Sequence, residues 1–138
     1  MTIDRSKTIE QLEQKYWGAP LYSSYLVRTC YALRSKPLEK FDVEDLRIMI
    51  GQQCNLQYLV PLALEFLAQN ILSSGDMYEG DLLYNLLRID SLYWEENIDE
   101  KSQMLRTIDR QWSTILAEDV LAFELQELEE LIRQIRTL

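Results

Sequence analysis

The feature that most limits the fold of this chain is the spacing of its apolar residues, which recur at three- and four-residue steps. The clearest example lies between Asn55 and Gln69, where leucine, alanine and phenylalanine side chains fall on one stripe of a helix. No segment alternates apolar and polar residues over a useful length, and no Asn-Gly or Asp-Gly pair marks a hairpin turn. The pattern predicts an all-α fold, a single compact multi-helix domain of about six to eight helices over residues 1–138.

Capping residues predict where several helices begin. Thr8 and Gln11 have the spacing of a capping box. Asp42 precedes a first turn rich in acids, and acidic side chains at a helix N-terminus interact favourably with the helix dipole. Asp81 can cap the helix that follows it. Pro61 lies inside the apolar stripe described above, so that helix either starts at the proline or kinks there.

The last forty residues contain neither glycine nor proline and keep the helical period. A straight helix of that length would be long for so small a protein, and we expect a break between Asp109 and Thr114 because Ser113 and Thr114 can cap. The final stripe approximates a heptad and can form a dimer seam, although packing on the protein's own core is the commoner outcome. This stripe comprises Leu121, Leu125, Leu128, Ile132 and Ile135.

Negative charge is concentrated in the middle of the chain. The net charge is −9, but residues 41–100 hold twelve acidic and two basic side chains, a net of −10. Residues 1–40 carry a net +3 and residues 101–138 a net −2. This balance argues against direct nucleic-acid binding, which needs clustered Lys and Arg, and favours a basic protein partner.

The rarest residue types exclude several kinds of site. The chain has no histidine, which excludes histidine triads and zinc–histidine sites. Its four glycines cannot form a phosphate loop or a dinucleotide fingerprint. Cys30 and Cys54 are expected as free thiols in a reducing compartment. With no targeting signal and no apolar run of about 20 residues, we expect a cytoplasmic protein without cofactor or membrane partner.

The densest acidic cluster surrounds Gly80 and allows four interpretations. Asp76, Glu79 and Asp81 could hold a divalent cation, although their spacing is not that of a calcium loop. A pair of them could perform acid/base catalysis in a carboxylate hydrolase. They could also cap helices on a solvated face. The fourth interpretation is an anionic docking surface for a basic protein, which would speed association.

For the docking interpretation we name seven candidate contacts. Aromatic residues supply many interface hot spots, and Tyr78, between acids and Gly80, is a better candidate than Tyr84 or Trp94, which we expect in the core. A surface of carboxylates resembles a nucleic-acid backbone in sign, so it suits the basic cleft of a nuclease. The candidates are Asp76, Tyr78, Glu79, Glu95, Glu96, Asp99 and Glu100.

A modest basic patch is expected near the N-terminus from Arg28, Arg34, Lys36 and Lys40. RNA binding would require more cations and exposed aromatic rings for stacking. We therefore expect these side chains to form salt bridges with the acidic middle of the chain.

Three segments of the chain carry a recognisable pattern: LRIMIGQ at 46–52, YLVPLALE at 58–65 and GDMYEGDLL at 75–83. Together they resemble a family of bacterial contact-dependent growth inhibition (CDI) immunity proteins. Leu26-Val27, the segment 33–38 and Trp94 also fit, so the resemblance covers roughly residues 8–96.

The resemblance implies a small helical cytosolic protein without enzymatic activity. Such a protein would bind the C-terminal toxin domain of a CDI effector, often a nuclease, and occlude its active site or substrate-binding surface. We expect a monomer in a 1:1 complex with that basic partner. The alternative is an acidic helical adaptor or regulator that has no toxin partner.

Overall fold

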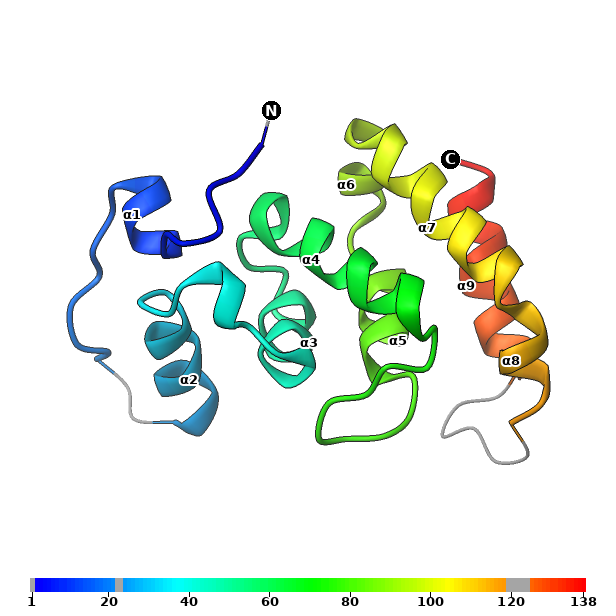
Figure 1. Ribbon diagram of the computed structural model, residues 1–138, viewed down its shortest axis with the longest axis horizontal. Coiled ribbons are helices and arrows are strands. Elements are labelled where there is room, and N and C mark those ends of the chain that lie inside the picture. The colour runs from blue at the N-terminus through cyan, green and yellow to red at the C-terminus, as the bar shows by residue number, and fades with distance from the viewer. Residues whose placement is uncertain (1, 22–23, 119–124) are drawn as a thin grey trace.

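The computed structural model describes residues 2–21, 24–118 and 125–138, and within these ranges the elements are helices joined by short connections (Figure 1). The all-α prediction is confirmed. The described residues hold nine α-helices, slightly more than expected, because several are only 5–7 residues long. The helices are α1 (Ile9–Glu13), α2 (Tyr25–Leu33), the 3-10 helix η1 (Leu38–Lys40), α3 (Val43–Gly51), α4 (Leu56–Gln69), α5 (Asp81–Leu87), α6 (Ser91–Glu96), α7 (Ile98–Arg110), α8 (Trp112–Leu116) and α9 (Leu125–Arg136).

The predicted capping box at Thr8 is confirmed, and a helix begins after Asp42 with acids in its first turn, as predicted. The backbone N–H of Gln11 donates to the Thr8 hydroxyl at 3.1 Å, and the Gln11 side chain accepts from the Thr8 N–H at 2.9 Å. Asp42 forms the same reciprocal box with Asp45 at the start of α3. Pro61 lies inside α4, which begins at Leu56, so the interpretation that the helix starts at the proline is wrong.

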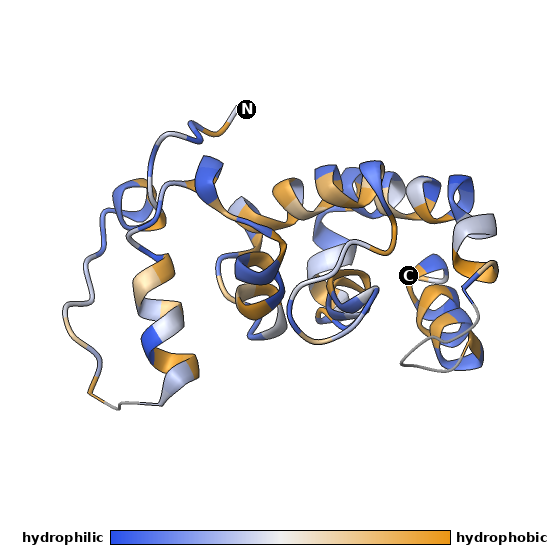
Figure 2. Ribbon diagram, turned by 60° about the horizontal axis from the view of Figure 1, so that its bottom comes forward, coloured by the Kyte–Doolittle hydropathy of each residue, from blue (hydrophilic) through white to orange (hydrophobic). Residues whose placement is uncertain are grey.

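The core is built around α3, α4 and α5. Helix α3 packs against α4 and α5, α4 packs against α7, and α5 packs against α9. Apolar and polar residues interleave along the helices in Figure 2, and no described helix is both long and apolar enough to cross a membrane. The large side chains that are almost fully buried include Leu46, Ile50, Leu59, Leu67, Leu82 and Trp94.

The predicted break near residue 111 is confirmed, but a serine or threonine hydroxyl does not cap it. Gln111 separates α7 from α8, and its side chain instead reaches the end of α4. Its Nε2 donates to the carbonyls of Leu67 and Ala68 at 2.8 and 3.1 Å, and its Oε1 accepts from the N–H of Ile71 at 2.7 Å. Gln111 thus satisfies backbone groups that the end of a helix leaves unpaired.

Helix α9 packs on the protein's own core, which is the commoner of the two outcomes expected from its sequence. Leu128, Ile132 and Ile135 are at most 5% exposed, and α9 contacts α5 and α7. Leu121, the first member of the predicted stripe, lies outside the described residues.

Candidate protein-docking surface

The seven candidate contacts fall into two separate groups. Asp76, Tyr78 and Glu79 lie in the connection between α4 and α5, at the lower edge of Figure 1. The other four belong to α6 and the start of α7, at the upper edge of the same view. The structure therefore brings the acids together within each group, and does not join the two groups into one surface.

Asp81 organises the first group from inside the protein. Its side chain is 1% exposed, and its carboxylate accepts N–H groups from Gly75 at 2.7 Å, Met77 at 3.1 Å and Tyr78 at 3.3 Å. The prediction that Asp81 caps α5 is wrong, because Gly80 occupies the N-cap position. The carboxylate instead pairs the backbone donors of the preceding loop, which would be costly to bury unpaired.

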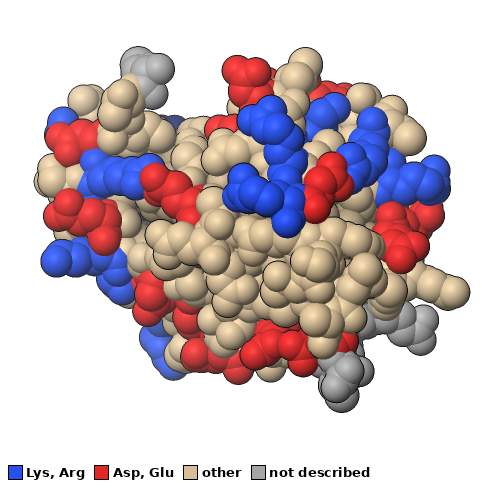
Figure 3. Space-filling model, turned by 45° about the vertical axis from the view of Figure 1, so that its right-hand side comes forward, with Lys and Arg blue, Asp and Glu red and all other residues tan. Residues whose placement is uncertain are grey.

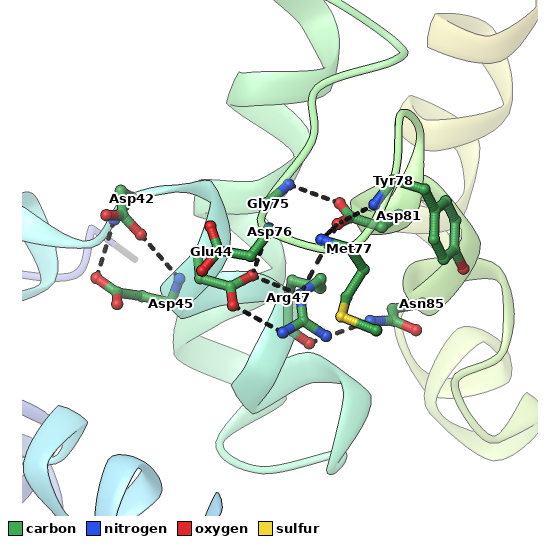
Figure 4. Close-up of polar contacts among 10 residues, drawn as sticks. All are labelled: Asp42, Glu44, Asp45, Arg47, Gly75, Asp76, Met77, Tyr78, Asp81 and Asn85. Atoms are coloured by element: carbon green, nitrogen blue, oxygen red, sulfur yellow. Dashed lines mark hydrogen bonds and ion pairs between the residues drawn. The ribbon is translucent and has the colours of Figure 1, made fainter. Parts of the chain in front are cut away.

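Arg47 of α3 links this loop to a second carboxylate. Its guanidinium donates to both oxygens of Glu44, at 2.5 and 2.7 Å, and lies 3.8 Å from the Asp81 carboxylate. Glu44 also accepts the N–H of Asp76 at 2.9 Å. Hydrogen bonding from Arg47 holds the pKa of Glu44 below its usual value. Figure 4 shows this network joining α3 to the loop.

Gly75 permits the close approach of the loop to α3. A Cβ atom at this position would lie 2.4 Å from Glu44 Oε1 and 3.0 Å from the Glu44 Cα. The second of these distances involves backbone, which a change of rotamer cannot relieve. Any side chain at residue 75 would therefore push the loop away from the helix.

The loop that this network fixes presents acidic and apolar side chains to solvent. Asp76 and Glu79 are exposed, and Met77 between them is 65% exposed. Repulsion from the neighbouring Glu44 raises the pKa of Asp76, and Asp42 adds to it. We call Asp42, Glu44, Asp76, Met77 and Glu79 the loop surface.

Three members of the loop surface were not among the sequence candidates. Asp42 and Glu44 belong to the first turn of α3, where acids are common for reasons of helix stability alone. Only the contact between α3 and the loop brings them beside Asp76, and no local pattern reports that contact. Met77 could have been identified from its position between two acids.

Tyr78 is less accessible than its position in the sequence suggests. It is half-buried and packs edge-to-face on Tyr84, with ring centroids 6.3 Å apart. The Tyr84 hydroxyl in turn donates to Glu127 of α9 at 2.5 Å. Trp94 is fully buried, as expected. Tyr78 therefore packs the loop against α5, and only part of its side chain is accessible beside the loop surface.

The second group is divided by burial. Glu95, Glu96 and Asp99 are exposed, whereas Glu100 is half-buried and accepts a hydrogen bond of 2.5 Å from the Tyr93 hydroxyl. Burial raises the pKa of Glu100. Glu100 thus joins α7 to α6, and the other three acids form the outer part of this group.

The contacts of Asp81 bear on the cation and hydrolase interpretations. Three backbone N–H groups and Arg47 surround its carboxylate, which in this structure pairs loop backbone rather than joining Asp76 and Glu79 in an exposed cluster. Over the described ranges, no three His, Cys, Asp or Glu side chains are grouped to hold a metal ion.

The expected basic patch is only partly paired with the acidic middle of the chain. Lys36 forms the predicted kind of bridge, with its Nζ 2.6 Å from Asp45. Arg34 is 1% exposed and instead pairs with Glu13, from its own end of the chain, at 2.7 Å. Cys30 and Cys54 are free and half-buried, and burial raises the pKa of both thiols.

Charged side chains are unevenly distributed on the face of α7 and α9. Figure 3 shows a row of Asp and Glu along the lower edge of this face, a broad uncharged area above it, and Lys and Arg interspersed with acids in the upper part. The lower edge is at the height of the connection between α4 and α5 in Figure 1. A basic partner that approaches this edge would meet several carboxylates.

Comparison with known proteins identifies one family. No curated protein and no solved structure matches the chain. The sequence model of the CDI immunity proteins matches residues 11–104, about two-thirds of the chain. This region contains the whole network around Arg47 and Asp81, together with the loop that it supports. The chain therefore belongs to the family of CDI immunity proteins.

Proposed function

We propose that this protein protects its cell by binding the C-terminal toxin domain of a cognate CDI effector in a 1:1 complex. The loop surface meets a basic active site or substrate-binding cleft of the toxin and occludes it. The observation that carries this proposal is an acidic loop held rigid from beneath, in a chain of the immunity family.

The electrostatics of the loop surface favour a cationic partner. Asp76 and Glu44 repel each other strongly enough to raise the pKa of Asp76. A lysine or arginine of the toxin placed beside them would offset that repulsion. A cation would therefore bind favourably next to these two carboxylates. Carboxylates in such an array replace the phosphates of a nucleic acid, which supports a nuclease as the toxin.

The rigidity of the loop reduces the cost of binding. A flexible loop would lose conformational entropy when it docked, whereas a loop already fixed by Asp81, Glu44 and Arg47 loses little. Occlusion then needs no rearrangement of the immunity protein.

The experiment compares two double variants that remove the same charge from different places. Asp76→Asn/Glu79→Gln neutralises two acids of the loop surface, and Glu95→Gln/Glu96→Gln neutralises two exposed acids of α6. Association with the toxin domain encoded beside this chain is measured by stopped flow at low and physiological salt. We expect the loop variant to slow association about tenfold at low salt, with a smaller effect at 0.15 M.

The α6 variant serves as the control for net charge. Equal slowing by both variants would mean that only the total charge matters, and a larger effect of the α6 variant would move the docking site to that helix. Absence of any complex with the toxin domain, together with growth arrest on co-expression, would overturn the immunity function and leave the adaptor alternative.

A further inference from the structure

The connection between α1 and α2, together with Tyr25 at the start of α2, exposes more large apolar side chains than any comparable part of the described chain. Leu21 is 93% exposed, Tyr25 69%, Tyr16 68% and Trp17 50%. Figures 1 and 2 both place this connection at the outer edge of the molecule, on the side away from α7 and α9. We call these four residues, three aromatic and one leucine, the aromatic surface. Several exposed large apolar side chains along one short segment are typical of a binding site rather than of ordinary solvent-facing surface.

The segment that carries the aromatic surface has no carboxylate. Between Glu13 and Glu39 the sequence contains four basic residues and no acidic one, in a chain with 23 acids. Two of the basic residues, Lys15 and Arg28, are exposed. A partner surface that carries carboxylates can therefore approach here, whereas the acidic middle of the chain would repel it.

A buried arginine fixes the position of Trp17. The guanidinium of Arg34 lies 3.9 Å from the centroid of the Trp17 ring, and its Nη2 donates to the carbonyl of Lys15 at 2.9 Å. Trp17 also packs edge-to-face on Tyr31 of α2, with centroids 5.0 Å apart. Glu13 completes the site by accepting from Arg34 at 2.7 Å.

This arrangement prepares the indole ring for binding. Burying an arginine is costly unless it is paired, and here the pairing immobilises a segment whose rings remain half or more exposed. A ring that is already fixed loses little entropy when a partner covers it, which is the property of an interface anchor.

A protein fits this surface better than a nucleic acid. Single-stranded nucleic acid needs stacking rings together with a track of cations. The exposed set here includes the aliphatic side chain of Leu21, and the net charge of −9 repels phosphates.

We infer that the aromatic surface is a second contact for the same toxin domain, and that the toxin face it meets is apolar with carboxylates at its rim. This inference rests on the proposed immunity function. The loop surface governs how fast the two proteins associate, and the aromatic surface governs how slowly they separate, because steering charges act mainly on association and buried anchors on dissociation.

The test measures dissociation of the toxin domain from three variants of the full chain. Tyr16→Ala/Tyr25→Ala removes two rings that are 68% and 69% exposed, and Trp17→Ala removes the anchored ring. Leu116→Ala is the matched control, since Leu116 is 54% exposed on α8. We expect dissociation to accelerate at least about tenfold in the first two variants, with association within about twofold of wild type and no change in the control.

Thermal unfolding of each variant separates loss of the contact from loss of the fold, because the double variant leaves the Arg34 site intact. A toxin complex of normal lifetime in both aromatic variants would overturn the inference and leave the immunity function standing. If the wild-type chain forms no toxin complex, both fail together.

Two further results would assign the surface elsewhere. Binding of a fluorescent oligouridylate at 0.15 M salt that is lost in Tyr16→Ala/Tyr25→Ala would make it a nucleic-acid site. A dimer of the free protein that the same variant dissociates would make it a self-association site. Either result would overturn the inference.

Discussion

Two surface segments of this protein are each held by a buried charge, and the charges have opposite signs. Beneath the α4–α5 loop the fixed point is Asp81, which collects three backbone N–H groups. Beneath the α1–α2 connection it is Arg34, which collects a backbone carbonyl and the face of an indole ring. Both side chains are 1% exposed.

The comparison shows that the sign of a buried charge determines which backbone groups it can pair with. It does not determine which side chains the same segment exposes to solvent. An anion holds N–H groups and a cation holds carbonyls, since each satisfies buried backbone groups of one kind. The loop above the buried anion displays further acids, and the segment above the buried cation displays aromatic rings. In both segments, the buried group that fixes the backbone is therefore distinct from the side chains that face solvent.

Removing the buried anion should have the largest effect. Asp81→Ala leaves three buried N–H groups without their acceptor and removes the carboxylate beside Arg47, so we expect a loss of about 4 kcal/mol in the free energy of unfolding. Urea denaturation measures the loss, and amide exchange at Gly75, Met77 and Tyr78 should accelerate. Loss of stability without faster exchange at those three amides would show that Asp81 does not hold the loop.

Removing the buried cation should cost less. Arg34→Met fills the same space and eliminates the Nε, which is buried and has no hydrogen-bond partner in the described part of the chain. It still leaves the Glu13 carboxylate without a cation, because only the Asn55 amide then donates to it, and we expect a loss of about 3 kcal/mol. Lys36→Met, which breaks the more exposed pair with Asp45, is the control, with an expected loss below about 1 kcal/mol. Equal losses in the two variants would contradict the assigned role of Arg34.

The glycines of the two segments should respond to alanine for different reasons. At Gly75 the added methyl meets the Glu44 backbone, and we expect about 2 kcal/mol of destabilisation. At Gly18 nothing lies within 4 Å, but φ is +72°, and we expect about 1 kcal/mol from backbone strain. Thermal unfolding gives both values. A larger loss of stability in Gly18→Ala than in Gly75→Ala would contradict this comparison. It would mean that the positive φ at residue 18 costs more than the steric clash at residue 75.

Acid should weaken the loop network slightly. The pKa of Glu44 is lowered in the folded protein by Arg47, so its stabilising contribution is complete above its ordinary value of 4.5 and is lost as the pH falls through the lower folded value. We expect Glu44→Gln to cost less than about 1 kcal/mol at pH 7 and less still near pH 3. A difference between variant and wild type that stayed constant with pH would mean that the ionised pair contributes nothing.

The helical period, the capping box at Thr8 and the position of the break near residue 111 could all be predicted from the sequence. Each depends on residues within a few positions of one another, such as Thr8 with Gln11. Membership of the CDI immunity family could also be inferred, because three segments between residues 46 and 83 carry the resemblance in the same order along the chain.

The roles of Asp81, Arg34 and Gln111 could not be predicted in the same way. Asp81 has the local signature of a helix cap, yet it serves the loop before it. Arg34 appears as one member of a basic patch, yet it is buried against Glu13 from 21 positions away. Gln111 closes the end of a helix more than 40 positions earlier. Such contacts are decided by packing between distant helices, which local patterns do not record.

The packing of α9 has a consequence for how members of the family can exchange parts. The shared signature ends at residue 104, inside α7, while Leu128, Ile132 and Ile135 of α9 are buried against the rest of the fold. A hybrid that joins the matched region of this chain to the C-terminal part of a relative would therefore replace one side of the contact between α5 and α9. We expect such a hybrid to fold only when the helix that replaces α9 fits the surface of α5.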